Sequence, residues 1–273
     1  MRLYKVKMLR MYNMDLADIK DFLSKYNNRS IVYIPNPGNA GDSLIAQGTV
    51  QLFDDLRLNW SMGEIGKTYK GETLFYAGGG NLVGLYGNCR DFLKRNKDHN
   101  QIVILPHTIK SEDAFLSKLN NNVIIFCRER TSYEYVLSVF KHRENVYLSK
   151  DMAFYIEGIE TYKATIGRGV CNAYRLDCEK TNIAIPRGNI DLSNALNKSK
   201  NTCDKNVITE VSHSVFAHIS KYEVINTNRL HIAIAGALLG KKVNFSPNSY
   251  YKNKAVFDYS IQNLYSKVSF MID

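Results

Sequence analysis

An arginine and a histidine stand two positions apart in the segment TNRLH, residues 227–231. The segment follows a run typical of a strand and begins a predicted helix over 229–239. At the amino end of a helix, Arg229 and His231 would add two donors to the positive end of the helix dipole, which suits a phosphate or a carboxylate. A bound dianion would favour the protonated imidazole, so His231 would donate a proton when such a ligand is present. A structural role for His231 is an equally good interpretation of the sequence alone.

A glycine-rich loop leads from a predicted strand at 30–35 into a predicted helix at 42–56. Gly38 and Gly41 allow the backbone to turn, and Asp42 or Ser43 is the expected cap of the helix. Free amides in such a loop can bind an anion or a sugar hydroxyl. The loop is not a Walker A loop, because no Gly-Lys-Ser/Thr follows it.

A second glycine-rich segment, AGGGN at residues 77–81, ends the next predicted strand. Three glycines in a row allow a ligand to approach the backbone closely. The dinucleotide fingerprint GxGxxG would need glycine at position 83, where Val83 stands, so NAD is disfavoured. Open α/β sheets bind ligands at the carboxyl ends of their strands, and both glycine-rich segments therefore predict a cleft at that edge.

Other kinds of site find no support in the sequence. His213 and His218 are five residues apart, not the four that align two ligands on a helix, and no cysteine pair has zinc-site spacing. No Asp-X-Asp pair and no GxSxG nucleophile elbow occur. The 18 tyrosines are not gathered with basic residues in a known nucleic-acid motif. We therefore expect no metal, no serine hydrolase chemistry and no nucleic-acid partner.

Short apolar runs alternate with helix-period segments between residues 30 and 150, as in a parallel sheet covered by helices on both faces. Strands are predicted at 30–35, 73–80, 101–106, 123–127 and 146–149, and helices at 42–56, 88–97, 111–119 and 131–140.

A smaller α/β region follows a polar stretch at 157–169. Its predicted strands are 169–174, 223–226 and 241–245, with 182–186 either a strand or irregular, and a last amphipathic helix spans about 256–264. We expect two domains, 1–157 and 158–273, with the last helix packing back on the first domain.

The 273-residue chain carries 36 lysines and arginines against 26 aspartates and glutamates, a formal net charge of +10. This excess predicts an anionic partner without identifying it. No stretch resembles a signal peptide or a membrane span, so the expected location is the cytoplasm. The five cysteines form no CxxC and are expected to be reduced. The basic residues within 2–10 fit a solvated helix or strand, and contact with anionic lipid is the alternative.

Eight motifs occur in the order found in the polysaccharide pyruvyl transferase family, which the chain resembles over about residues 34–259. They are NPGNAGD (36–42), AGGGN (77–81), ILPHTI (104–109), CRERTS (127–132), KDMAF (150–154), YRLDCEK (174–180), TNRLH (227–231) and NSYYK (248–252). The sequence departs from the family's usual residue at His107, Glu129 and Tyr251. The resemblance implies an α/β, GT-B-like fold: two Rossmann-like domains with parallel sheets, a cleft between them, and a smaller second domain.

The resemblance also implies an activity, the transfer of pyruvate from phosphoenolpyruvate to a sugar as a ketal, with release of phosphate. His231 would be the general acid, Arg229 would neutralise the donor, and Asp42 is a possible base. The donor would be bound by Arg128, Arg130, Arg168, Arg175, Asn228 and Lys252, with the second domain as the donor side. The first domain would hold the acceptor through Asn39, Gly41, Gly79, Gly80, Asn81 and His107.

Several expectations about partners follow from the same resemblance. Phosphoenolpyruvate is a co-substrate, and no cofactor or metal is expected. The acceptor is expected to be a sugar on a polysaccharide or a polyprenyl-diphosphate-linked precursor, which would bring the enzyme to the anionic inner face of the membrane. Three other functions stay open: a GT-B glycosyltransferase that uses a nucleotide sugar, a non-catalytic partner in glycan assembly and, third, a nucleic-acid binder.

Overall fold

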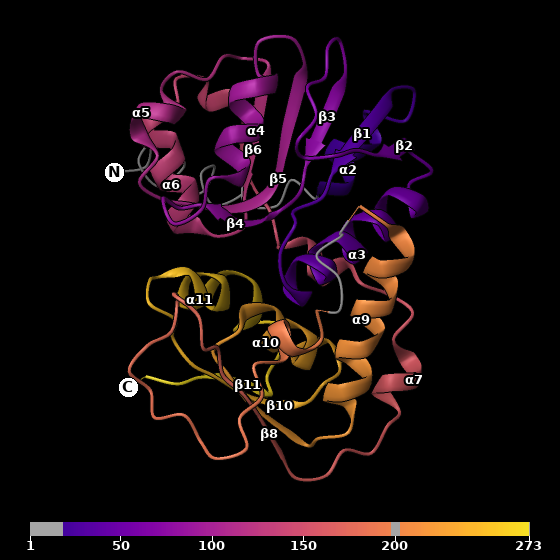
Figure 1. Ribbon diagram of the computed structural model, residues 1–273, viewed down its shortest axis with the longest axis vertical. Helices are drawn as coiled ribbons and strands as arrows, with labels where there is room; N and C mark the ends of the chain where they lie inside the picture. Colours follow the sequence, from indigo (N-terminus) through magenta and orange to yellow (C-terminus); the bar gives the residue numbers. More distant parts are fainter. Residues whose placement is uncertain (1–18, 198–202, 273) are drawn as a thin grey trace, which may run out of the picture.

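The computed structural model describes residues 19–197 and 203–272, which form two lobes, each built around a parallel sheet (Figure 1). The basic residues within 2–10 lie outside the described residues. Both sheets consist of short apolar runs followed by helices, the arrangement that the alternation of sequence patterns predicts.

The first lobe contains sheet A. Its strands pair in the order β2-β1-β3-β5-β6-β7, with β4 added to β5, and every pairing is parallel. The strands are β1 (Ser30–Ile34), β2 (Asn59–Met62), β3 (Thr73–Tyr76), β4 (Gly79–Leu82), β5 (Gln101–Ile109), β6 (Val123–Cys127) and β7 (Val146–Leu148). The helices are α2 (Ile19–Ser24), α3 (Ala40–Asp55), α4 (Asn88–Asn96), α5 (Asp113–Leu116) and α6 (Arg130–Val139), then the short helices η1 (Arg143–Asn145) and η2 (Met152–Tyr155).

The second lobe contains sheet B, which is smaller and also parallel, in the order β11-β10-β9-β8. Its strands are β8 (Val170–Ala173), β9 (Val224–Thr227), β10 (Lys242–Phe245) and β11 (Val268–Phe270). The helices are α7 (Glu160–Lys163), α8 (Leu192–Ala195), α9 (Lys205–Ser220), α10 (Leu230–Leu238) and α11 (Lys252–Val256), which continues as the π-helical turn η3 (Phe257–Ile261).

Helix α3 joins the two lobes. Figure 1 shows it between them, with α9 of the second lobe alongside. Thr209 and Ser212 of α9 donate hydrogen bonds to the Gln47 side chain and the Ser43 carbonyl of α3. The first turns of α3 also pack into the apolar core of the second lobe. The amino end of α3 is therefore fixed by both lobes.

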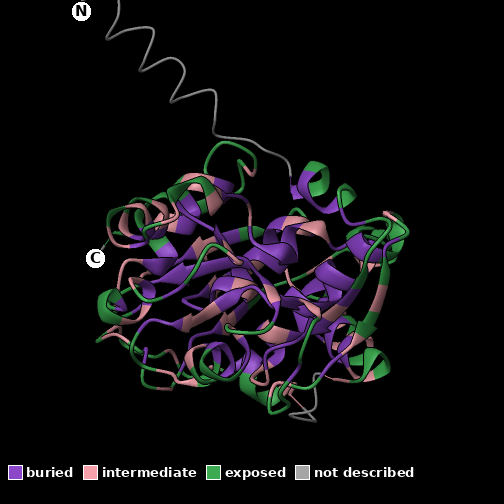
Figure 2. Ribbon diagram, turned by 90° about the horizontal axis from the view of Figure 1, so that it is seen from above, coloured by how far each residue is buried: buried purple, intermediate pink, exposed green. Residues whose placement is uncertain are grey.

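Apolar burial holds both lobes together. The strands and the inner faces of the helices are buried, and the exposed residues lie at the periphery (Figure 2). Burial of apolar surface contributes roughly 25 cal/mol per Å², so these cores dominate the stability of the elements that carry the loops.

Most predicted elements are confirmed, and several corrections are needed. The strand predicted at 73–80 is two strands, β3 and β4, and the segment 182–186 is irregular. Several elements were not predicted, among them β2 and β11, which have only four and three residues, and α9. The apolar residues of α9 do recur at helical spacing, at Ile208, Val211, Val215, Phe216 and Ile219, so the signal was present in the sequence.

One predicted helix cap and the length of another predicted helix are also wrong. Asn39, not Asp42 or Ser43, caps α3, because the helix begins two residues earlier than predicted. The predicted helix at 111–119 is reduced to the four residues of α5, and Ser111 has a φ of 58°.

Contacts cross between the lobes at the end of the chain. The Tyr251 hydroxyl donates to the Ile109 carbonyl at 2.9 Å, and the Arg130 guanidinium lies 5.7 Å from the ring centre of Tyr259. Sheet A ends at Leu148 and sheet B begins at Val170. The domain boundary after residue 157 stays a prediction.

Candidate active site

A cavity of about 170 Å³ lies where the carboxyl ends of both sheets meet. The first lobe lines it with the loop before α3, the start of β4, the loop before α4, and Arg128 after β6. The second lobe lines it with the segment after β8, the start of α8, the amino end of α10 and the start of α11. The lining residues are Pro37, Gly38, Asn39, Asp42, Gly79, Gly80, Asn81, Tyr86, Asn88, Arg128, Arg175, Glu179, Ser193, Arg229, Leu230, His231 and Lys252.

The amino end of α3 presents a capping box to the cavity. The Asn39 side chain accepts from the Gly41 amide at 2.8 Å, and the Asp42 carboxylate accepts from the Asn39 amide at 3.0 Å. Burial raises the pKa of Asp42, although the nearby His231 opposes the shift. A carboxyl group with a raised pKa beside a cavity is suited to exchange protons with a ligand.

Asn81 faces the same cavity and is held by a buried polar group behind it. Its side-chain amide donates to Asn36 Oδ1 at 2.8 Å and to the Tyr76 hydroxyl at 3.0 Å. The Nε2 atom of His107 lies 3.1 Å from the backbone amide nitrogen of Asn81. His107 is fully buried and does not line the cavity, so its predicted contact with the acceptor is corrected to a supporting contact with Asn81. Burial lowers the pKa of His107 to about 3, and the ring is therefore neutral near pH 7.

Arg128 lies at the floor of the cavity beneath Gly80. Its Nε donates to Thr108 Oγ1 and its Nη1 to Asp151 Oδ2, both at 2.8 Å. A Cβ atom placed on Gly80 would lie 2.9 Å from Nη2 of Arg128. Glycine at this position therefore allows the third guanidinium nitrogen to face the cavity. The Tyr250 hydroxyl lies on the same side of Gly80 and is buried with no hydrogen-bond partner among the described residues.

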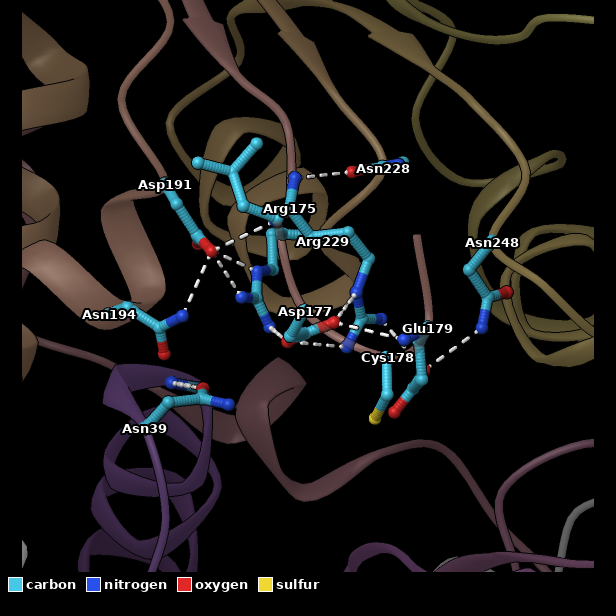
Figure 3. A network of polar contacts seen from close by, with 12 residues as sticks. Asn39, Arg175, Asp177, Cys178, Glu179, Asp191, Asn194, Asn228, Arg229 and Asn248 are labelled. Carbon is cyan, nitrogen blue, oxygen red and sulfur yellow. Dashed lines mark hydrogen bonds and ion pairs between the residues drawn. The ribbon is translucent and has the colours of Figure 1, made fainter. Parts of the chain in front are cut away.

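The second lobe contributes a network of alternating charges (Figure 3). Arg229 donates to Asp191 through Nε at 2.9 Å and Nη2 at 2.6 Å, and its Nη1 pairs with Asp177 at 2.8 Å. Arg175 donates to the other side of Asp177 through Nε at 2.7 Å and to Glu179 through Nη1 at 2.7 Å. Both guanidinium groups are therefore already engaged by carboxylates of their own lobe.

Glu179 is the point where this network meets the first lobe. Its carboxylate pairs with Lys252, accepts from Asn248 at 3.0 Å, and accepts from the hydroxyl of Tyr86 at 3.0 Å. Burial alone would raise the pKa of Glu179, but Lys252 and Arg175 outweigh it and lower the pKa to about 2. Burial lowers the pKa of Lys252 to about 8, since Arg175 and Arg128 add to the shift that Glu179 opposes.

His231 stands on the first turn of α10, opposite the capping box of α3. A Cβ atom on Gly41 would lie 2.5 Å from its Nδ1, so only glycine fits there without displacing the ring. Its Nε2 lies 3.4 Å from Asp151 Oδ2. Within the described part of the chain no side chain caps α10, which leaves its first amides beside the cavity.

Ten of the fifteen predicted site residues line the cavity, and five do not. Of these five, Gly41 packs directly against His231. Arg168 is exposed at the amino end of β8, the opposite edge of sheet B, so its donor-binding role is corrected. Arg130 packs on Tyr259, and the buried Asn228 accepts from the Arg175 amide at 2.7 Å. These two residues support the site from behind, as His107 does.

The sequence interpretation missed the carboxylates that pair with the cations of the site. Asp151, Asp177 and Glu179 belong to the motifs KDMAF and YRLDCEK, so a signal was present, but nothing in the spacing says which cation each one pairs with. Asp191 lies outside all eight motifs. Among residues 19–197 and 203–272, no group of three or more His, Cys, Asp or Glu side chains is placed to hold a metal ion. In the same ranges no helix is long and apolar enough to cross a membrane.

Two parallel Rossmann-like sheets with a polar cavity between them define a GT-B-like protein of two α/β domains. Residues 39–250 match the family described as polysaccharide pyruvyl transferase, and the chain belongs to this family. Its members' role is pyruvyl transfer in polysaccharide biosynthesis.

A solved structure supports the assignment of the fold. It is that of a functionally uncharacterised protein from Klebsiella pneumoniae subsp. pneumoniae NTUH-K2044, 32% identical to this chain, with a TM-score of 0.83. The match covers 93% of this chain and 97% of that one. No curated protein matches the sequence.

Proposed function

We propose that the protein transfers pyruvate from phosphoenolpyruvate to two hydroxyls of a sugar as a ketal and releases phosphate. The acceptor is a sugar of a polysaccharide or of its polyprenyl-diphosphate-linked precursor. The reaction needs no cofactor or metal, because protonation, nucleophilic attack and loss of phosphate all use acid, base and anion-binding groups.

The proposal rests on one observation: His231 and the amino end of α10, which no described side chain caps, face Arg128 and the glycine-rich loops of the first lobe across a small cavity. Phosphoenolpyruvate has a phosphate and a carboxylate on one carbon, so it needs two anion sites beside a proton donor. The amino end of α10 suits one anion. Arg128 Nη2 and Lys252 suit the other, and the Tyr250 hydroxyl, which has no hydrogen-bond partner among the described residues, lies near them.

The chemistry proceeds in balanced steps. His231 gives a proton to the methylene carbon of the donor, whose π pair forms the new C–H bond. A sugar hydroxyl attacks the adjacent carbon and loses its proton to Asp42 or back to His231. The phosphate then leaves with the C–O bonding pair, and a second hydroxyl closes the ketal while its proton leaves with the phosphate.

Arg229 and Arg175 act in this scheme through their carboxylate partners. All three guanidinium nitrogens of Arg229 are engaged by Asp177 and Asp191. A donor anion at the amino end of α10 would therefore lie beside Arg229 while Arg229 stays paired with these two carboxylates. We propose that Arg229 and Arg175 hold the loop after β8 in place and supply a positive field, with Lys252 and Arg128 as the direct anion ligands.

The first lobe is the proposed acceptor side. Asn39, Asp42 and Asn81 line the cavity there, and their amide and carboxyl groups can pair with sugar hydroxyls. A lipid-linked acceptor would bring the protein to the cytoplasmic surface of a membrane, where part of the +10 net charge would favour anionic lipid.

Assay of purified protein tests this proposal. Release of phosphate from phosphoenolpyruvate should depend on an acceptor sugar, and the His231→Ala variant should lose activity by about 10²- to 10⁴-fold. Near wild-type turnover in His231→Ala would exclude it as the general acid.

The alternative is transfer of a sugar from a nucleotide sugar, whose diphosphate would lie at the amino end of α10 in place of phosphoenolpyruvate. Calorimetric binding of a nucleoside diphosphate, with none of phosphoenolpyruvate, would favour the alternative.

A further inference from the structure

We infer that Asp151, to which the sequence analysis assigns no role, is a positioning residue for His231, and that the proton passes to the donor from Nδ1 of His231 rather than from Nε2. The inference rests on the proposed function, because it assigns the atom through which that reaction's proton moves. The general acid and the residue that positions it then come from different lobes, with Asp151 on the first and His231 on the second.

The Asp151 carboxylate is fixed in one orientation. Its side chain has no exposed surface. Oδ1 accepts from the Ala153 amide at 2.9 Å and so caps η2. Oδ2 accepts from Arg128 Nη1 at 2.8 Å and lies 3.4 Å from His231 Nε2. A carboxylate held by two hydrogen bonds leaves one direction for the imidazole that approaches it.

This carboxylate selects the tautomer of His231. A carboxylate only accepts hydrogen bonds, so Nε2 must carry the hydrogen that points to Asp151. In neutral His231, Nδ1 then holds the lone pair, and in the imidazolium it holds the proton that can leave. Burial alone would raise the pKa of Asp151, but His231 and Arg128 lower it well below the ordinary range. Asp151 is therefore a permanent anion near pH 7.

Nδ1 points toward the amino end of α3, and glycine at position 41 lets the imidazole ring approach that end closely. A Cβ atom there would lie 2.5 Å from Nδ1 and 2.9 Å from Oδ1 of Asn39. Nδ1 thus faces the same end of the cavity as the capping box of α3. The charged groups around His231 are Asp151 at the cap of η2, Arg128 after β6 and Asp42 on α3.

The proton step then has defined atoms. The Nδ1–H bond of the imidazolium breaks as the methylene carbon of phosphoenolpyruvate takes the proton through its π pair. His231 is left neutral with its hydrogen on Nε2, still directed at Asp151. The proton released by the first sugar hydroxyl restores the Nδ1–H bond, directly or through Asp42.

The test uses ¹⁵N-histidine-labelled full-length protein without substrate, with the His231 signals assigned by their loss in His231→Ala. We expect neutral His231 to be the Nε2–H tautomer in the wild type and a mixture of tautomers in Asp151→Asn. An Nδ1–H tautomer in the wild type would overturn the inference. This measurement needs no activity, so it stands apart from the proposed pyruvyl transfer.

Kinetics supply the second test. Asp151→Asn should lower kcat by about 10²- to 10⁴-fold with little change in the donor KM. The alkaline decline of its activity should begin at a lower pH than in the wild type. Asp151→Glu should restore part of kcat.

The matched control is Glu129→Gln, which also removes a buried carboxylate that caps a helix, one residue from Arg128. It should lower the melting temperature and leave the pH profile unchanged. If Asp151→Asn only loses stability, as Glu129→Gln does, and keeps the wild-type kcat and pH profile, Asp151 is structural and the inference fails.

Discussion

The Tyr86 hydroxyl of the first lobe donates a 3.0 Å hydrogen bond to Oε1 of Glu179 in the second. Glu179 also pairs with Arg175 and Lys252, and both of them line the cavity. The Glu179 carboxylate thus connects Tyr86 of the first lobe to two cationic side chains of the second lobe.

Removing the Tyr86 hydroxyl should weaken the contact between the two lobes at the cavity without unfolding the protein. In Tyr86→Phe, Glu179 keeps its bonds to Arg175, Lys252 and Asn248, so we expect a stability loss of about 0.5–1.5 kcal/mol. The KM for donor or acceptor should rise, because one contact between the lobes is lost. Denaturant unfolding and steady-state kinetics measure the two effects. Tyr162→Phe, which removes an exposed hydroxyl bonded to His213, is the control and should leave both KM values unchanged.

Donor binding should weaken as the pH rises through about 8. Burial lowers the pKa of Lys252 to about 8, so its positive charge is present below that pH and is lost above it. The kcat/KM for phosphoenolpyruvate should therefore decline on the alkaline side. In Lys252→Arg the charge persists at every pH in the assay, and the part of the decline due to Lys252 should disappear. An identical alkaline limb in the variant would remove Lys252 from donor binding.

Acid should destabilise the fold through Glu179. Its pKa is about 2 in the folded protein against an ordinary 4.5. Its contribution to stability is therefore complete above about pH 4.5 and is lost as the pH falls toward 2. Glu179→Gln leaves Lys252 and Arg175 without this partner and should cost about 3–5 kcal/mol at pH 7. In urea unfolding, the gap between wild type and variant should narrow at pH 3; a constant gap would contradict the assignment.

A methyl group at position 80 should disturb the donor site. The Cβ of Gly80→Ala would lie 2.9 Å from Arg128 Nη2, so the guanidinium must move away from the cavity. We expect a higher KM for phosphoenolpyruvate and a smaller effect on the acceptor KM. Gly66→Ala is the matched control, since its Cβ meets nothing within 4 Å. Equal kinetics for both variants would show that Arg128 Nη2 does not contact the donor.

The layered α/β fold could be predicted because buried parallel strands are continuous apolar runs. The run 123–127 matches β6 at both ends. The edge strand β2 could not be predicted in this way, since Asn59, Trp60, Ser61 and Met62 alternate between exposed and half-buried positions and form no apolar run.

The glycine-rich loops and the arginine and histidine of TNRLH could be predicted as a site because parallel strands end at one edge. The charge balance of the site could not. Arg128 and Asp151 are 23 residues apart, and Arg229 and Asp191 are 38 apart. Only the fold brings each pair together, so cations that the sequence leaves free for an anion are already paired with carboxylates.

The most direct test of the proposed reaction is a mass spectrum. The purified protein is incubated with ¹³C-labelled phosphoenolpyruvate and a panel of lipid-linked and free sugars. Our account predicts that an acceptor gains the mass of one labelled pyruvyl ketal, with one phosphate released for each, and that His231→Ala forms almost none. Phosphoenolpyruvate left intact with every acceptor, while a sugar is transferred from a nucleotide sugar, would contradict it.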